Sequence, residues 1–168
     1  MNADEMAIEL AKQCDAEAVY ALYQSLINTP YSIWSEDYPS RDLVYDDVHA
    51  GHVLVMRRQE GGIASAIAIL PAEEEPEFDD IAPWYNDIEK WAIPSRLGVA
   101  SDMQGKGIAK RMLQTAMDYA HENGCGAVRF LVAKSNPIAQ RAYARLNFDV
   151  CGETEMWDTR WLCYQKRL

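Results

Sequence analysis

The chain has 168 residues, of which 49% are apolar and 25% are charged, and its formal net charge is −10. This length suits one domain that buries about 68–70% of the unfolded surface, so we expect residues 1–168 to form a single domain. An acidic chain without a basic stripe is a poor nucleic-acid binder. Its longest apolar run, residues 63–70, is too short to cross a bilayer. With no apolar signal segment near Met1, these features predict a cytoplasmic protein without nucleic-acid or membrane partners.

Two short helices are expected near the N-terminus. Residues 16–27 carry apolar side chains at helical spacing, and Asp15 precedes them as a candidate N-cap. A turn-rich loop with three aromatic residues follows. Ser40 is then the candidate N-cap of a second helix, which Gly51 ends.

A hairpin of two strands follows the helices. The strands are "HVLVMRR" and "GIASAIAIL", separated by "QEGG". Residues 71–93 are acidic and contain proline, and we expect a long loop there with a short helix at Trp84–Trp91. "SRLGVAS" predicts a strand that ends near Ala100.

The second half alternates between strands and helices. A long amphipathic helix begins at Ile108, with "NGCG" as its C-terminal signal. "AVRFLVA" predicts a buried strand, and "SNPIAQRAYARLNF" a helix with Asn136 as N-cap and Pro137 in its first turn. Two further strands, "FDVCGETEM" and "RWLCYQKRL", complete the chain.

The cysteines and histidines show no metal-ligand pattern. The four cysteines form no CxxC pair, and the three histidines form no ligand set at the usual spacing. We therefore expect reduced thiols and no metal site.

The main chemical signal is a turn poor in side chains just before the long helix. Backbone N–H groups at a helix N-terminus, with its partial positive charge, favour a phosphate or pyrophosphate. Gly105 and Gly107 would let the main chain approach that group, and Lys106, Lys110 and Arg111 would attract it. A Walker A loop does not fit, because Lys106 is followed by glycine rather than by serine or threonine. A GxGxxG dinucleotide motif fails because Lys110 stands where the last glycine belongs.

The pattern that does fit is [Q/R]xxGx[G/A], with a second pattern near the C-terminus. The first reads Gln104-Gly105-Lys106-Gly107-Ile108-Ala109, and the second is N-x6-Y-x4-F, carried by Asn136, Tyr143 and Phe148. With these motifs and the order of elements, the chain resembles the GNAT superfamily of N-acetyltransferases over nearly its whole length. It also resembles a bacterial group of that superfamily through Trp34, Tyr38 and Pro39 and through "CYQK" at Cys163–Lys166.

The resemblance implies an α/β (α+β) fold of the GNAT type. Its central sheet would be mixed and mostly antiparallel, with six to seven strands, about four flanking helices and a splay between the fourth and fifth strands. The cofactor would be acetyl-coenzyme A (acetyl-CoA), and Tyr143 the general acid toward the departing thiolate. The implied cofactor-binding residues are Leu97, Gly98, Val99, Gln104, Gly105, Lys106, Gly107, Ile108, Ala109, Lys110 and Asn136.

The acceptor is less clearly indicated. Trp34, Tyr38 and Trp84 are expected to line its pocket, and the acidic residues 1–94 (19 acids and 5 bases, a sum of −14) would attract a cationic amine. Some branches of the superfamily carry an acidic residue five positions before the asparagine, but this chain has Leu131 there. Glu89, Glu155 and Asp37 are candidate bases by position alone, although an acidic residue of this kind is more often a solvated surface charge than a base.

Two functional readings follow. The first is an acetyl-CoA-dependent N-acetyltransferase that acts on a primary amine of a small molecule or peptide by direct attack. The second is a catalytically silent acyl-coenzyme A-binding module, which Leu131 and the lack of an evident base favour. Transfer to oxygen and a longer acyl donor also stay open. Homodimers are common among similar proteins, so a homodimer is possible.

Overall fold

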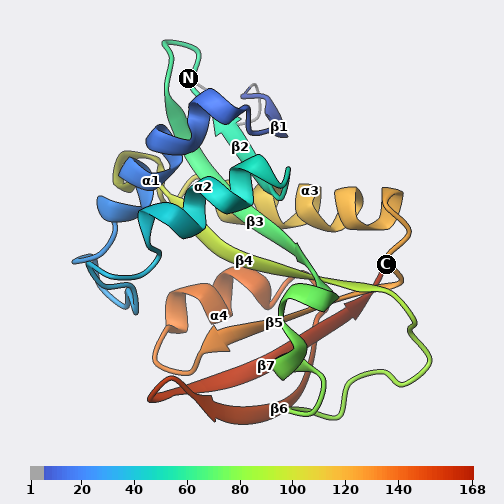
Figure 1. Cartoon of the computed structure of the whole chain (residues 1–168). Coiled ribbons are helices and arrows are strands. Elements are labelled where there is room, and N and C mark those ends of the chain that lie inside the picture. Colours follow the sequence, from blue (N-terminus) through green and yellow to red (C-terminus); the bar gives the residue numbers. More distant parts are fainter. Residues whose placement is uncertain (1–5) are drawn as a thin grey trace. The chain divides into compact units, whose positions relative to one another are not determined.

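The structure is a computed structural model that describes residues 6–168. Its strands form one sheet in the order β1-β2-β3-β4-β5-β7-β6 (Figure 1). The strands are β1 Ile8–Leu10, β2 Val53–Arg57, β3 Ile63–Pro71, β4 Trp91–Val99, β5 Ala127–Ala133, β6 Asp149–Met156 and β7 Thr159–Arg167. The α-helices are α1 Ala16–Gln24, α2 Arg41–His49, α3 Ile108–Glu122 and α4 Pro137–Tyr143. The described residues contain seven strands and four α-helices, which agrees with the six to seven strands and about four helices that the resemblance implies.

The fold class is also confirmed in its strand directions. The pairs β1–β2, β2–β3, β5–β7 and β6–β7 are antiparallel, and β4–β5 is parallel. The parallel pairing joins Trp91 to Ala127 and Ala92 to Val128. It lies at the N-terminal ends of both strands, as a splay farther along would require; the splay itself stays a prediction.

The described chain divides into two compact units, and each is treated by itself. Unit 1 contains residues 6–69 and 96–116, and unit 2 contains residues 70–95 and 117–168. Both β4 and α3 pass from one unit to the other. A single domain over the whole chain stays a prediction.

The helices of unit 1 begin where the sequence indicates. Ser40 caps α2 by accepting a hydrogen bond from the backbone N–H of Leu43, and this confirms the expected N-cap. Asp15 occupies the N-cap position of α1, but its side chain makes no capping bond. Its carboxylate instead accepts bonds from the backbone N–H of Lys12 and from Arg57. Helix α1 ends at Gln24 rather than residue 27, since turns follow it.

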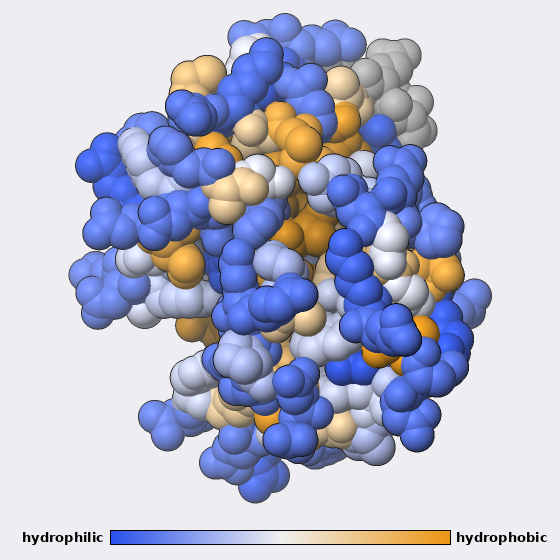
Figure 2. Space-filling model, turned by 45° about the vertical axis from the view of Figure 1, so that its right-hand side comes forward, coloured by the Kyte–Doolittle hydropathy of each residue, from blue (hydrophilic) through white to orange (hydrophobic). Residues whose placement is uncertain are grey.

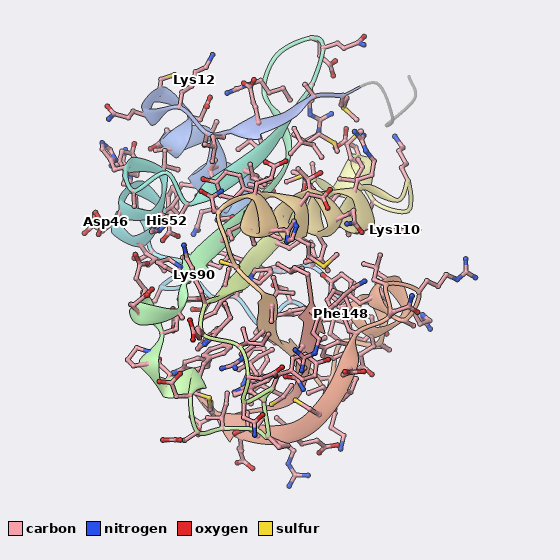
Figure 3. All side chains as sticks on the ribbon, turned by 90° about the vertical axis from the view of Figure 1, so that its right-hand side faces the viewer. Lys12, Asp46, His52, Lys90, Lys110 and Phe148 are labelled. Carbon is pink, nitrogen blue, oxygen red and sulfur yellow. The ribbon has the colours of Figure 1, made fainter. Side chains whose placement is uncertain are left out.

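The expected hairpin forms the centre of unit 1. Strands β2 and β3 pair from Val53↔Ala68 to Arg57↔Ile63, and nearly all their side chains are buried. Figures 1 and 3 show α1 and α2 on one side of these strands and α3 on the other, which explains why both faces are apolar. Strand β1 was not expected from the sequence, because three half-exposed residues are too few to show a period.

Unit 2 contains the C-terminal strands and α4. Strand β5 pairs with β7 along its whole length, and β6 and β7, the two expected C-terminal strands, pair with each other as a hairpin. Strand β4 begins at Trp91, four residues before the expected start, because Trp91 and Ala92 gain their partners from distant β5. Helix α4 ends at Tyr143, before the expected Phe148, and Asn147 then adopts a left-handed φ of 55°.

The expected short helix at Trp84–Trp91 is wrong. The long loop instead holds two 3-10 turns, Ala72–Glu74 and Pro76–Phe78. At Tyr85 the backbone groups bond to side chains from distant strands: Gln165 accepts from the N–H of Tyr85, and Arg129 donates to its carbonyl. These distant partners take the place of the local backbone hydrogen bonds that a helix would need.

The described residues contain no helix that is both long and apolar enough to cross a membrane. Figure 2 shows one face of the molecule, which is mostly hydrophilic with hydrophobic residues in small areas. All four cysteines are free thiols.

Candidate active site

The glycine-containing turn of unit 1 is open to solvent. Gln104, Gly105, Lys106 and Gly107 are exposed, and the turn leads directly into α3. Gly105 and Gly107 adopt left-handed φ angles of 75° and 76°, and a Cβ added at either position would meet nothing within 4 Å. Glycine is therefore needed here for its backbone conformation, and the space above the backbone is free for a ligand.

The turn ends at the N-terminus of a 15-residue helix. The helical ladder begins with the bond from the N–H of Arg111 to the carbonyl of Gly107, so the amides of Ile108, Ala109 and Lys110 come before the first bond. Lys110 lies in this first turn (Figure 3) and is exposed, as is Lys106. Amides, the helix dipole and two lysines together favour an anion.

Strand β4 presents one edge of peptide groups away from β3. The carbonyl of Gly98 accepts a hydrogen bond from Ser65 of β3, and the N–H of Ala100 donates to Ala64 of the same strand. Because successive residues of a strand direct their polar groups to opposite sides, those of Leu97 and Val99 point to the other edge. The side-chain amide of Gln104 donates to the Val99 carbonyl at 3.1 Å and so ties the turn to this strand.

Arg96, the residue immediately before Leu97 in the chain, forms a buried ion pair with Asp47. Arg96 is 8% exposed, and its Nη2 donates to Oδ2 of Asp47 at 2.5 Å. Its Nη1 lies 3.4 Å from the hydroxyl of Tyr38. Burial alone would lower the pKa of Arg96, but the Asp47 carboxylate and the neighbouring tyrosines raise the pKa above its ordinary value. The guanidinium is therefore charged at every pH of interest.

Aromatic residues of unit 1 pack beside this pair. The ring of Tyr23 meets Trp34 edge to face at 5.0 Å between centroids. A Cβ built on Gly98 would lie 3.1 Å from the Tyr23 ring and from Leu26. Of the predicted acceptor residues, Trp34 is half-buried and Tyr38 is 43% exposed, so both reach the surface of unit 1.

In unit 2, the residues of the second motif come together in an aromatic cluster. Tyr143 of α4 contacts Phe130 of β5 and Phe148 edge to face, with centroid distances of 5.9 and 6.5 Å. Tyr164 of β7 stacks on Phe130 at 5.5 Å. The Nζ of Lys166 donates to the carbonyl of Leu146 at 2.6 Å and lies 5.7 Å from the Phe148 ring. Phe148 is labelled in Figure 3.

The environment of Tyr143 keeps its phenol neutral. Desolvation by burial, with a smaller effect of Tyr164, raises the pKa of Tyr143 above the usual value of about 10. A neutral phenol can donate a hydrogen bond or a proton as negative charge develops on a neighbouring atom.

Asn136 is confirmed as the N-cap of α4. Its Oδ1 accepts a hydrogen bond from the N–H of Ala139 at 3.0 Å, and Pro137 occupies the first turn as expected. The capping bond fixes the side-chain rotation and uses the oxygen. Of the polar atoms of this side chain, the amide nitrogen makes no hydrogen bond to another described residue, and it is thus the atom that can bind a ligand.

Trp84 is a packed residue of unit 2, whereas Trp34 and Tyr38 belong to unit 1. It is 9% exposed, donates its indole N–H to the carbonyl of Phe78 and stacks on the Phe78 ring. The guanidinium of Arg129 lies 5.5 Å from the Trp84 ring and 4.3 Å from that of Trp91. Trp84 therefore anchors the loop, and its role in acceptor binding stays a prediction.

The three candidate bases are all on the surface. Glu89, Glu155 and Asp37 are exposed, and Glu155 lies 3.7 Å from Arg160. Leu131 is part of β5. Sequence reasoning missed the Asp47–Arg96 pair, because residues 49 positions apart give no local pattern.

Comparison with known proteins agrees with this geometry. Residues 7–148 match the Acetyltransferase (GNAT) family. Among curated proteins, no sequence is significantly similar to the chain.

Several solved structures share the fold. An acetyltransferase of the GNAT family from Streptococcus agalactiae is 24% identical, with a TM-score of 0.79, and the match covers 97% of this chain and 95% of that one. YncA from Salmonella typhimurium, solved with its cofactor acetyl-CoA, is 18% identical, with a TM-score of 0.73 and coverage of 98% and 94%. Ribosomal-protein-alanine N-acetyltransferase from Brucella melitensis is 19% identical, with a TM-score of 0.75 and coverage of 96% and 99%. The family match spans most of the sequence, and the chain therefore belongs to the Acetyltransferase (GNAT) family.

Proposed function

We propose that this protein is an acetyl-CoA-dependent N-acetyltransferase that acts on a primary amine of a small molecule or peptide. The observation that carries the proposal is the exposed turn at Gly105 and Gly107, with its open backbone at the start of α3. The pyrophosphate of acetyl-CoA suits this turn, because it is an anion that bare amides and a helix N-terminus stabilise. The family match and the acetyl-CoA-bound Salmonella structure support the choice of cofactor.

The remaining cofactor contacts are assigned to backbone and amide groups. The polar groups of Leu97 and the N–H of Val99, which point away from β3, would pair with the pantetheine arm as an added strand does. The amide nitrogen of Asn136 would bond the arm while its oxygen caps α4. These groups hold the thioester without a covalent enzyme intermediate.

Tyr143 is assigned to the leaving thiolate. The amine attacks the thioester carbonyl, the carbon–sulfur bond breaks, and the electron pair stays on sulfur. The neutral phenol of Tyr143 donates a hydrogen bond or its proton to that sulfur as charge develops. The attacking nitrogen must also lose a proton, and water is the acceptor we assign, because the candidate carboxylates are exposed surface groups.

A catalytically silent acyl-coenzyme A-binding module is the second candidate. It is favoured by Leu131 at the position where some branches of the superfamily carry an acid and by the surface location of Glu89, Glu155 and Asp37. Such a module would bind the cofactor through the same turn and would not release its thiol. The two candidates therefore differ in turnover and agree in binding.

The first experiment tests cofactor binding with Gly107→Ala. We expect the acetyl-CoA affinity, measured by calorimetry, to fall by at least about tenfold, equivalent to 1.4 kcal/mol. Gly124→Ala is the matched control, because Gly124 has a φ of 83° and equally open space at the other end of α3. Both variants suffer a similar strain of about 1–2 kcal/mol. Equal acetyl-CoA affinities of Gly107→Ala and Gly124→Ala would show that the turn does not bind the cofactor.

The second experiment measures thiol release from acetyl-CoA with a panel of amines. Polyamines and lysine-like compounds should be acetylated if the acidic residues attract a cationic acceptor. Acetylation of anionic amino acids alone would refute that part of the proposal. Binding of acetyl-CoA without thiol release from any amine would favour the silent module.

A further inference from the structure

Arg96 has an unusual backbone conformation at a position that matters for the proposed function. Its φ is 50°, in the left-handed region, although it is not a glycine and lies within β4. A long side chain rarely adopts this conformation, so surrounding contacts must hold it. The next residue, Leu97, begins the edge whose peptide groups point away from β3.

The contacts that hold Arg96 come from two other segments of unit 1. Asp47 of α2 accepts from Nη2 at 2.5 Å, and the two side chains are only 8% and 4% exposed. Tyr38, from the loop before α2, places its hydroxyl 3.4 Å from Nη1. A planar guanidinium can bind both partners at once because its N–H groups form a rigid fork.

This cluster is not arranged for greatest stability. The Nε of Arg96 and the hydroxyl of Tyr23 are both buried, and neither has a hydrogen-bond partner among residues 6–168. A buried ion pair is itself often no more stable than well-packed apolar residues of similar volume. The chain thus keeps a charged pair, a strained backbone and unpaired polar atoms at one place, which is typical of a functional constraint.

We propose that the Asp47–Arg96 pair is a positioning pair: it holds Arg96 at its left-handed φ and thereby orients the peptide groups of Leu97 and Val99 toward the pantetheine arm. The inference rests on the proposed use of acetyl-CoA. Asp47 and Arg96 act through the backbone in this account.

The geometry of β4 explains how the pair would act. From Leu97 to Ala100 the polar groups alternate between the two edges, and Gly98 and Ala100 are fixed by bonds to β3. If Arg96 relaxed to a negative φ, the peptide group entering Leu97 would rotate. The ligand-facing N–H groups would then lose their alignment, while the turn at Gly105 and Gly107 would keep its own geometry.

This separation leads to a binding experiment with two ligands. Acetyl-CoA uses both the turn and the β4 edge, whereas adenosine 3′-phosphate 5′-diphosphate, which lacks the pantetheine arm, uses only the turn. We expect Arg96→Lys to weaken acetyl-CoA binding on the order of tenfold, because misplacement by about 1 Å has large effects. Its affinity for the nucleotide fragment should stay within about twofold of the wild type.

A second variant separates positioning from stability. The double variant Asp47→Leu/Arg96→Met replaces the buried pair by apolar side chains and should fold with little loss of stability. It should nevertheless show the same selective loss of acetyl-CoA affinity. Tyr38→Phe removes only the weaker 3.4 Å contact and leaves the bond between Arg96 and Asp47, so it should lower the acetyl-CoA affinity less than Arg96→Lys does.

The matched control is a partly buried ion pair elsewhere in unit 1. Arg57 binds Asp15 at 2.6 Å from β2, away from residues 97–99 in the chain, and Arg57→Lys should change both affinities equally or not at all. The proposal that this pair positions the β4 edge would be overturned if Arg96→Lys and the double variant kept the wild-type ratio of acetyl-CoA affinity to nucleotide-fragment affinity. Failure of the wild type to bind either ligand would instead overturn the proposed function.

Discussion

The hydroxyl of Ser65 donates a hydrogen bond of 2.6 Å to the carbonyl oxygen of Gly98, and Ser65 is fully buried. With the bond from the N–H of Ala100 to the carbonyl of Ala64, this bond shows that the polar groups of Gly98 and Ala100 face β3. Those of Leu97 and Val99 therefore face away from β3. The orientation that we assign to cofactor binding therefore depends on the packing around Gly98.

Gly98→Ala should destabilise unit 1. The added Cβ would lie 3.1 Å from Leu26 Cδ1 and from two atoms of the Tyr23 ring, a tighter contact than packed side chains normally make. Overpacking of this kind costs about 1–3 kcal/mol. Urea unfolding should show this loss in the free energy of unfolding.

Gly126→Ala is the control for that measurement. Its added Cβ would lie 3.4 Å from Ile88 Cδ1, an ordinary contact with the end of a flexible side chain. A change within about 0.5 kcal/mol is expected. Equal losses at the two positions would show that Gly98 is not the tighter site.

Tyr143→Phe should abolish most turnover and leave cofactor binding intact. The ring keeps its contacts with Phe130 and Phe148, while the donor to the leaving sulfur is lost. We expect kcat to fall about 10²–10⁴-fold, with the acetyl-CoA affinity unchanged. Tyr164→Phe, the same change in the same cluster, should leave kcat within about threefold of the wild type. A similar fall in both variants would point to packing rather than to proton donation.

The raised pKa of Tyr143 predicts a pH profile. Burial keeps the phenol protonated beyond its usual pKa of about 10, so Tyr143 should cause no decline in kcat between pH 7 and about pH 9.5. The profile is measured at saturating acetyl-CoA and acceptor. A decline centred below pH 9 that is absent from the residual activity of Tyr143→Phe would contradict this assignment.

Asn136 offers a test that separates its two roles. Asn136→Ala loses the bond to Ala139 and should cost about 1 kcal/mol of stability. Asn136→Asp keeps an oxygen for that bond and removes the amide donor. If the amide binds the pantetheine arm, both variants should bind acetyl-CoA more weakly, and only Asn136→Ala should be less stable. Normal binding by Asn136→Asp would exclude the amide from the site.

Asp15 predicts an acid-sensitive contribution to stability. The hydrogen bonds from Arg57, with that from Lys12, hold the pKa of Asp15 below its ordinary value. A carboxylate with a lowered pKa stabilises the fold fully above its unfolded pKa of about 3.9 and loses that contribution as the pH falls further. The free energy of unfolding of the wild type should therefore exceed that of Asp15→Asn by about 1–3 kcal/mol at pH 7. The difference should shrink below about pH 4, and an equal difference at pH 3 would refute the account.

Local sequence signals predicted the elements and motifs whose causes are local. Ser40 and Asn136 cap their helices as expected, because an N-cap bonds a backbone N–H only three residues away. The hairpin of β2 and β3 follows from two apolar runs with a short turn between them. Gly105 and Gly107 indicated an open turn, since glycine alone adopts their φ at little cost.

Features that depend on distant partners were decided by the tertiary structure. The helix expected at Trp84–Trp91 does not form, because Arg129 and Gln165 take the backbone groups of Tyr85. Strand β4 starts at Trp91 because β5 supplies partners there. Asp47 and Arg96 meet only when α2 packs against β4. Periodicity and capping act over a few residues, so the sequence by itself determined most of the elements and the open glycine turn. Pairings across tens of residues arise only when the chain folds.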